Sequence, residues 1–215
     1  MSVCNVFVGN DAIYCVTDTM VYRGTNPAGL CRTKALVSNN GLFAFAMRGT
    51  SYFAVRAANR FISAESFDDA ERIMNSFRRS LNNEALRSSD GEITLMGWSH
   101  CRERLVATRF DFSLDNKNIV TRACERGHNL APGIPGACLP SHADEGVMVK
   151  IALAQYKAST YFNLSMCIGG VMHFTTVTRD GAEQRIVGAY PGHKEHAENF
   201  GCPNKDELGH IEELQ

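Results

Sequence analysis

The chain has 215 residues, 44% of them hydrophobic, so it can bury a full core, and its length fits one large domain better than two small ones. Its 22 basic and 23 acidic residues are spread along the chain and give a formal net charge of −1, which argues against a nucleic-acid or membrane-surface partner. No apolar run approaches the roughly 20 residues that span a bilayer, and the first residues lack the pattern of a signal peptide. A cytoplasmic location is therefore expected.

The first 19 residues have the pattern of a β-hairpin. The runs 2–8 (SVCNVFV) and 12–19 (AIYCVTDT) are rich in β-branched and aromatic residues, and the Gly-Asn-Asp sequence between them is a turn signal. The two strands of a hairpin are antiparallel, so the start of the first lies beside the end of the second. Ser2 and Asp18 are therefore expected together at the open end of this hairpin.

A second hairpin is expected after a loop. Residues 23–31 (RGTNPAGLC) are rich in Gly, Asn and Pro and are interpreted as the loop. Residues 33–37 and 42–47 have strand patterns and are joined by a tight Asn-Asn-Gly turn. Pairing of these strands would bring Lys34 and Gly49 to the same end.

Helices and strands follow in the rest of the chain. Apolar residues at helical spacing predict two helices, over 50–61 and 66–81. The elements expected after them are strands at 92–98, 105–112 and 119–123, a Gly/Pro-rich loop at 127–140, a helix at 143–162 and strands at 171–178 and 183–190. This order is typical of an α+β fold with antiparallel sheets and helices outside them. We expect one domain over 1–190 and a polar C-terminal tail or helix over 191–215.

Four residues with a regular spacing lie at expected strand ends. Ser2, Asp18, Lys34 and Gly49 follow one another at intervals of 16, 16 and 15 residues. If Met1 is removed, Ser2 becomes the N-terminal residue, and its free α-amine can act as the base for its own hydroxyl. The ordinary pKa of an α-amine is roughly 7.7–8.0, close to neutral pH. Ser2 would then supply both the nucleophile and the general base.

These residues, with the run GLFAFAMRGTSYF, resemble the proteasome β-subunit family and its bacterial relatives, which are N-terminal nucleophile (Ntn) hydrolases. The resemblance is most specific over residues 2–62, and beyond them it rests on element order, the Gly169-Gly170 pair and the turn at 179–181. It implies a four-layer αββα sandwich, in which two antiparallel sheets pack face to face. It also implies hydrolysis of amide bonds in a peptide or protein substrate, a ring-shaped homo-oligomer, and an ATP-dependent unfoldase as a candidate partner.

The resemblance implies a role for each residue of the site. Ser2 would replace the family's usual N-terminal threonine as the nucleophile. Lys34 would lower the proton affinity of the hydroxyl and the amine, and Asp18 would hold that lysine in place. The backbone N–H of Gly49 would donate a hydrogen bond to the oxyanion of the tetrahedral intermediate.

The chain departs from the family at two places. Arg48 precedes Gly49 where relatives often carry a small residue, so a long cation is expected to cross the specificity pocket or to contact an acidic group of the substrate. Before Gly169, the family places an aspartate and a serine that support the N-terminal amine. Here the corresponding residues are Ser165 and Ile168, of which only Ser165 can form a side-chain hydrogen bond.

Neither a metal nor a cofactor is expected. The eight cysteines are scattered and never form a CxxC motif, which argues against a disulfide scaffold and a zinc ribbon. The C-terminal region contains four residues of zinc-ligand type whose spacing matches no compact zinc motif: His193, His196, Cys202 and His210. Cys4 is expected on the same strand face as Ser2 and is interpreted as a core thiol.

Two alternatives to a peptidase are open. One is a catalytically silent proteasome-like protein that serves assembly or binding, because a chain that keeps Met1 has no free amine on Ser2. The other is a small-molecule acylase on the same fold. At the level of single residues, Asp18 and Lys34 have the alternative interpretation of an ordinary surface ion pair, and Gly49 that of a turn residue.

Overall fold

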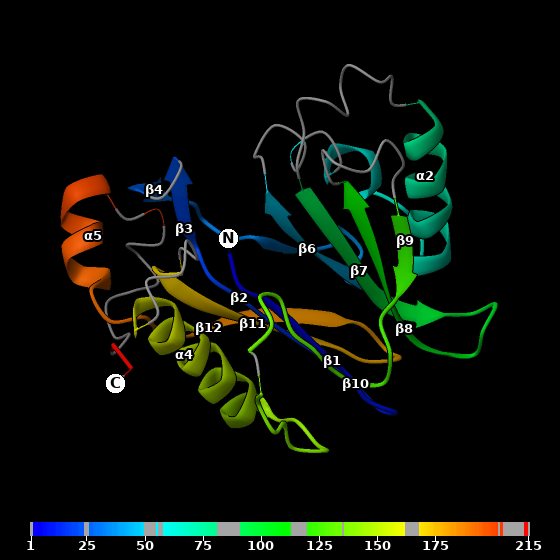
Figure 1. The fold of residues 1–215 in the computed structure, drawn as a ribbon. Coiled ribbons are helices and arrows are strands. Elements are labelled where there is room, and N and C mark those ends of the chain that lie inside the picture. Colours follow the sequence, from blue (N-terminus) through cyan, green and yellow to red (C-terminus); the bar gives the residue numbers. More distant parts are fainter. Residues whose placement is uncertain are drawn as a thin grey trace.

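We describe the protein from a computed structural model (Figure 1), in which the described residues are 2–23, 26–49, 55, 58–80, 91–112, 120–134, 136–161, 168–201, 203 and 213–214. These residues form helices and antiparallel sheets, which confirms the α+β class. The expected helix at 50–61 lies mostly outside the described residues. None of the described helices is long and apolar enough to cross a membrane.

The first sheet has five strands in the order β10-β1-β2-β11-β12, and every neighbouring pair is antiparallel. The predicted N-terminal hairpin forms its centre, with Cys4 opposite Thr17. The strands are β1 (Cys4–Val8), β2 (Ile13–Thr17), β10 (Gly127–Asn129), β11 (Val171–Val177) and β12 (Ala182–Ala189).

The second sheet has the order β5-β6-β7-β8-β9, again antiparallel throughout. Its strands are β5 (Ala35–Val37), β6 (Phe43–Gly49), β7 (Gly91–Ser99), β8 (Arg104–Phe112) and β9 (Val120–Ala123). A separate two-stranded sheet joins β3 (Met20–Arg23) and β4 (Asn26–Leu30). Among the described residues, the helices whose two ends are defined are α2 (Phe67–Ser80), α4 (Glu145–Tyr161) and α5 (His193–Phe200).

Two interpretations of loop segments were wrong. The segment 23–31 contains β4, and the Gly/Pro-rich segment 127–140 begins with β10. Pro27 is tolerated in β4 because this strand pairs on one side only, so its missing N–H need not interrupt a ladder. Both strands form through pairing with another segment rather than through a strong pattern of their own.

The two five-stranded sheets pack against each other through one cluster of buried side chains. It includes Val6 and Ile13 of the first sheet and Ala44 and Met96 of the second. Along β6 the side chains alternate. Ala44 and Ala46 face the first sheet, whereas Phe43 and Phe45 face α2. The sequence FAFA is therefore apolar at every position because β6 is buried on both faces.

Helices cover the outer faces of both sheets (Figure 1). Phe67 and Met74 of α2 share a cluster with Ile93 and other residues of the second sheet. Met148 and Ala152 of α4 share another cluster with residues of the first sheet. The buried side chains thus form three clusters, one between the sheets and one under each helix.

The C-terminal region returns to the first sheet. Helix α5 lies within the segment expected as a polar tail or helix. Farther along, the N–H of Leu214 donates to the carbonyl of Ala189 at 2.9 Å, and the Leu214 side chain packs with the cluster under α4.

Close packing of α2 on the second sheet yields a stability prediction. A Cβ atom at Gly97 of β7 would lie 2.6 Å from Cβ of Phe67, closer than side chains pack. Gly97→Ala should therefore lower the free energy of unfolding by about 1–3 kcal/mol, measured by urea denaturation. The matched control is Gly29→Ala, because a Cβ at Gly29 meets nothing within 4 Å. Equal changes in the two variants would contradict this account of the α2 interface.

Candidate active site

The open end of the first hairpin holds Ser2 and Asp18. Because Cys4 pairs with Thr17, the residues before β1 meet the residues after β2. The backbone N–H of Val3 donates to Oδ1 of Asp18 at 2.9 Å. The hairpin therefore orients the Asp18 carboxylate next to the segment that carries Ser2.

The ammonium group of Lys34 lies at the centre of the site. Its Nζ donates to Ser2 Oγ at 2.7 Å, to Asp18 Oδ2 at 2.9 Å and to the carbonyl of Met20 at 2.5 Å. An ammonium has three N–H bonds, so each finds one acceptor here. The structure thus brings Lys34 into contact with both Ser2 and Asp18, the arrangement that the resemblance implied.

The Asp18–Lys34 ion pair is buried. The Asp18 side chain has 0% of its surface exposed, and that of Lys34 has 12%. The alternative interpretation as a surface ion pair was therefore wrong. Burial also raises the pKa of the nearby Tyr190 phenol well above its usual range, and the charge of Asp18 adds to this effect. Lys34 is the only described cation that forms an ion pair with Asp18.

A glycine pair supports the chain just after Asp18. The N–H groups of Thr19 and Met20 both donate to the carbonyl of Gly169, at 3.2 and 3.1 Å. Gly170 has φ of 79°, and a Cβ atom there would lie 2.3 Å from Oγ1 of Thr19. Only glycine fits this close approach and this backbone conformation. The pair therefore holds the segment whose Met20 carbonyl accepts from Lys34.

Gly49 ends β6 at the same edge. The N–H of Met47 donates to the carbonyl of Lys34 at 2.8 Å, so the end of β6 lies beside the lysine as predicted. Gly49 is exposed and has φ of 100°, a conformation that favours glycine. Its partner across the ladder is Gly91, the first residue of β7.

Arg48 takes part in a cluster of charges on the second sheet. Its Nη1 lies 3.6 Å from Oε2 of Glu92, and Nε of Arg109 lies 3.3 Å from Oε1 of the same carboxylate. The Arg48 side chain keeps 14% of its surface exposed. Two guanidinium groups therefore share one carboxylate, and the sequence analysis missed Glu92 because only the ladder pairing reveals it.

Ser165 and Ile168 occupy the two positions at which the family supports the N-terminal amine, and the structure shows no such support from them among the described residues. Ser165 lies outside the described residues. The Ile168 side chain is buried in the cluster under α4, and its carbonyl accepts from the hydroxyl of Tyr22 at 3.4 Å. Sequence reasoning also did not single out Met20, since any residue supplies a carbonyl and no side-chain signal marks it.

The cysteines near the hairpin are core thiols. Cys4 is 1% exposed and lies in the cluster between the sheets, which confirms its interpretation. The Cys15 thiol donates a hydrogen bond to Cys4, which together with burial raises the pKa of Cys15 well above its usual range, and burial raises the pKa of Cys124 to about 11. Cys15 and Cys124 therefore stay protonated at neutral pH and are poor nucleophiles.

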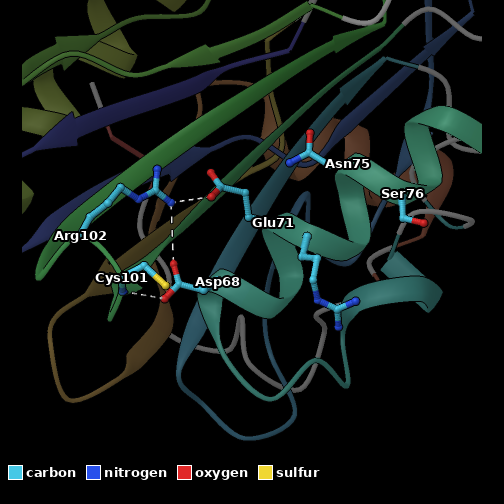
Figure 2. A pocket seen from close by; sticks show the side chains of 7 residues that line it. Asp68, Glu71, Asn75, Ser76, Cys101 and Arg102 are labelled. Carbon is cyan, nitrogen blue, oxygen red and sulfur yellow. Dashed lines mark hydrogen bonds and ion pairs between the residues drawn. The ribbon is translucent and has the colours of Figure 1, made fainter.

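A separate polar pocket lies between α2 and the turn from β7 to β8 (Figure 2). Its volume is about 420 Å³, and its lining includes Asp68, Glu71 and Arg102. Burial favours a raised pKa for Asp68, but hydrogen bonds from Ser99, Cys101 and His100 lower it below its usual value. Glu71 accepts from Arg102 at 2.5 Å and from Thr108 at 2.6 Å. These carboxylates fasten α2 to the sheet at the opposite end of β7 from Gly91.

The described residues contain no group of three or more His, Cys, Asp or Glu side chains that could hold a metal ion. Of the four C-terminal residues of zinc-ligand type, Cys202 and His210 lie outside the described part of the chain.

Comparison of the chain with protein-family models and with curated proteins finds no match.

Burial of the ion pair leads to a second stability prediction. In Asp18→Asn the Lys34 ammonium keeps its position but loses its counter-charge, which should lower the free energy of unfolding by about 3 kcal/mol. Urea denaturation followed by the fluorescence of the single tryptophan, Trp98, measures this change. Asp11→Asn is the control, because Asp11 is exposed and should change stability by less than about 0.5 kcal/mol. A small effect at both positions would contradict a buried, structurally required pair.

Proposed function

We propose that the protein is an amide-bond hydrolase, a proteasome-like peptidase whose nucleophile is Ser2 after removal of Met1. The observation that carries this proposal is the 2.7 Å hydrogen bond from Lys34 Nζ to Ser2 Oγ, made by an ammonium that the buried Asp18 holds in place. A cation against a hydroxyl favours the alkoxide over the alcohol, which is the activation that a serine nucleophile needs.

The proposed reaction passes through an acyl-enzyme. The α-amine of Ser2 accepts the hydroxyl proton as Oγ bonds to the substrate carbonyl carbon, and the N–H of Gly49 stabilises the resulting oxyanion. The C–N bond then breaks, and the proton moves from the α-amine to the leaving amine. Water hydrolyses the ester in the same way, which releases the carboxylic acid and restores Ser2. No metal or cofactor takes part in these steps.

The arrangement of the layers supports the same proposal. Two antiparallel sheets packed on each other, with α2 and α4 on their outer faces, are consistent with the four-layer αββα sandwich of the Ntn hydrolases. By the same resemblance we propose a ring-shaped homo-oligomer in the cytoplasm, a peptide or protein substrate, and an ATP-dependent unfoldase as a partner.

The second candidate is a catalytically silent assembly or binding protein. One observation favours it: the side chain of Ile168 is buried in the core, where relatives of the proposed family carry a serine near the amine. A site without that support would orient the α-amine less well.

Intact-mass spectrometry distinguishes the two candidates. The untagged protein should lose Met1 and gain one adduct when incubated with a peptide epoxyketone or a β-lactone, because both react with an activated N-terminal hydroxyl. The variant Ser2→Ala should gain none. Retention of Met1, or a processed chain that forms no adduct, would refute the hydrolase and support the silent protein.

Arg48 provides a prediction about specificity. If its guanidinium contacts an acidic group of the substrate, Arg48→Ala should lower kcat/KM about tenfold for fluorogenic peptides with an acidic residue before the cleaved bond. Peptides with an apolar residue there should be affected less. Arg185→Ala is the matched control, since Arg185 pairs with Glu145 at the surface. An unchanged ranking of the peptides in Arg48→Ala would remove this residue from the substrate site.

A further inference from the structure

Lys34 stands next to a strand that is paired on one side only. β5 has three residues and is the edge of the second sheet, with β6 as its one ladder neighbour among the described strands. The backbone groups on the free side of an edge strand have no strand partner. The pairing with β6, including the bond from the N–H of Met47 to the carbonyl of Lys34, thus restrains the lysine from one direction.

Gln184 supplies the partner on the free side. It lies on β12, the edge strand of the first sheet, and its Nε2 donates to the carbonyl of Ala35 at 2.9 Å and to Oγ1 of Thr175 at 3.0 Å. The one hydroxyl proton of Thr33 has two acceptors within reach, the carbonyl of Ala35 at 2.7 Å and Oε1 of Gln184 at 3.3 Å. Oγ1 of Thr33 also accepts from the N–H of Ala35 at 3.1 Å. The Gln184 amide therefore ties the residue after Lys34 to the other sheet and lies against the hydroxyl of the residue before it.

The hydrogen bond from Gln184 to Ala35 joins the two sheets, and the residues of the candidate site also come from both sheets. Ser2 and Asp18 are held by the hairpin of the first sheet, whereas Lys34 precedes a strand of the second. The distance from Nζ to Ser2 Oγ therefore depends on how the two sheets are placed relative to each other at this edge. Gln184 fixes that placement one residue to either side of the lysine.

We infer that Gln184 is a positioning residue for Lys34, an inference that rests on the function proposed above. Gln184 has no bond to Ser2 in this arrangement and acts through the backbone of residues 33–35. Without its amide, the described partner that remains on the free side of Ala35 is the hydroxyl of Thr33. The ammonium is then less well held against the nucleophile. A displacement of about 1 Å can slow catalysis by up to about 100-fold.

The first test measures the restraint on Lys34 without any enzyme activity. Reductive methylation with formaldehyde and cyanoborohydride, followed by peptide mass mapping, gives a rate for each lysine. Lys34 should react about fivefold faster in Gln184→Ala than in the wild type, the factor expected for the loss of one net hydrogen bond. Lys150 and Lys157, which are exposed on α4, serve as internal references with unchanged rates.

Two further variants sharpen this test. Gln184→Glu keeps the size of the side chain and an acceptor for Thr33 but loses both N–H donors, so Lys34 should again react faster. Glu183→Ala is the matched control, because Glu183 is the exposed neighbour of Gln184 on β12. An unchanged Lys34 rate in both Gln184 variants would overturn the positioning role, and the near-isosteric Glu variant keeps the test valid if the Ala variant folds poorly.

The second test measures the consequence for Ser2. With saturating epoxyketone, the rate of adduct formation should fall about tenfold in Gln184→Ala, while the final labelled fraction and the inhibitor concentration for half-maximal rate stay unchanged. A merely structural role would lower the labelled fraction instead of the rate. A wild-type rate in Gln184→Ala would overturn the inference. A wild-type protein that forms no adduct would refute the proposed function instead, and the methylation rates then decide the positioning role alone.

Discussion

The three hydrogen bonds of the Lys34 ammonium constrain the rest of the site. Their acceptors belong to the segment before β1, to the residue after β2 and to the start of β3. A largely buried cation requires an acceptor for each of its protons and a nearby counter-charge. Because Lys34 itself leads into the second sheet, these requirements join both sheets and the small β3–β4 sheet at one point.

Other charged groups of the protein are arranged differently. The Arg48–Glu92–Arg109 cluster and the Asp68–Glu71–Arg102 group consist of carboxylates and guanidinium groups that form ion pairs with one another. Such groups fasten strands and helices together. A hydroxyl also lies in the second group, where Oγ of Ser99 accepts from Nε of Arg102 at 3.0 Å and donates to Asp68 at 2.6 Å. The Lys34 group differs because its hydroxyl belongs to Ser2, whose own α-amine would be free to act as a base after removal of Met1. This difference is why we propose the chemistry at the edge where the two sheets meet and not at the polar pocket beside α2.

Weak strand patterns and contacts between residues far apart in the sequence limited the prediction of the fold from local sequence. β4 and β10 have few of the residues that favour strands, and they are strands because β3 and β1 offer them ladder partners. The partner of β4 is the preceding element β3, whereas the partner of β10 is β1 near the start of the chain, and in both cases the partner rather than the segment's own residues makes the strand. The Gly169-Gly170 pair was visible in the sequence, but the hydrogen bond from the N–H of Thr19 to the carbonyl of Gly169 joins residues that lie far apart along the chain.

By itself, the sequence determined the N-terminal hairpin, which puts Ser2 beside Asp18, and the second hairpin, which puts Lys34 beside the end of β6. These features are local, because strand period and turn chemistry act over a few residues. The tertiary structure alone decided that the Asp18–Lys34 pair is buried, that Met20 supplies the third acceptor and that Gln184 ties the two sheets beside the lysine. Each of these depends on how two sheets pack, and packing brings together groups that the sequence keeps far apart.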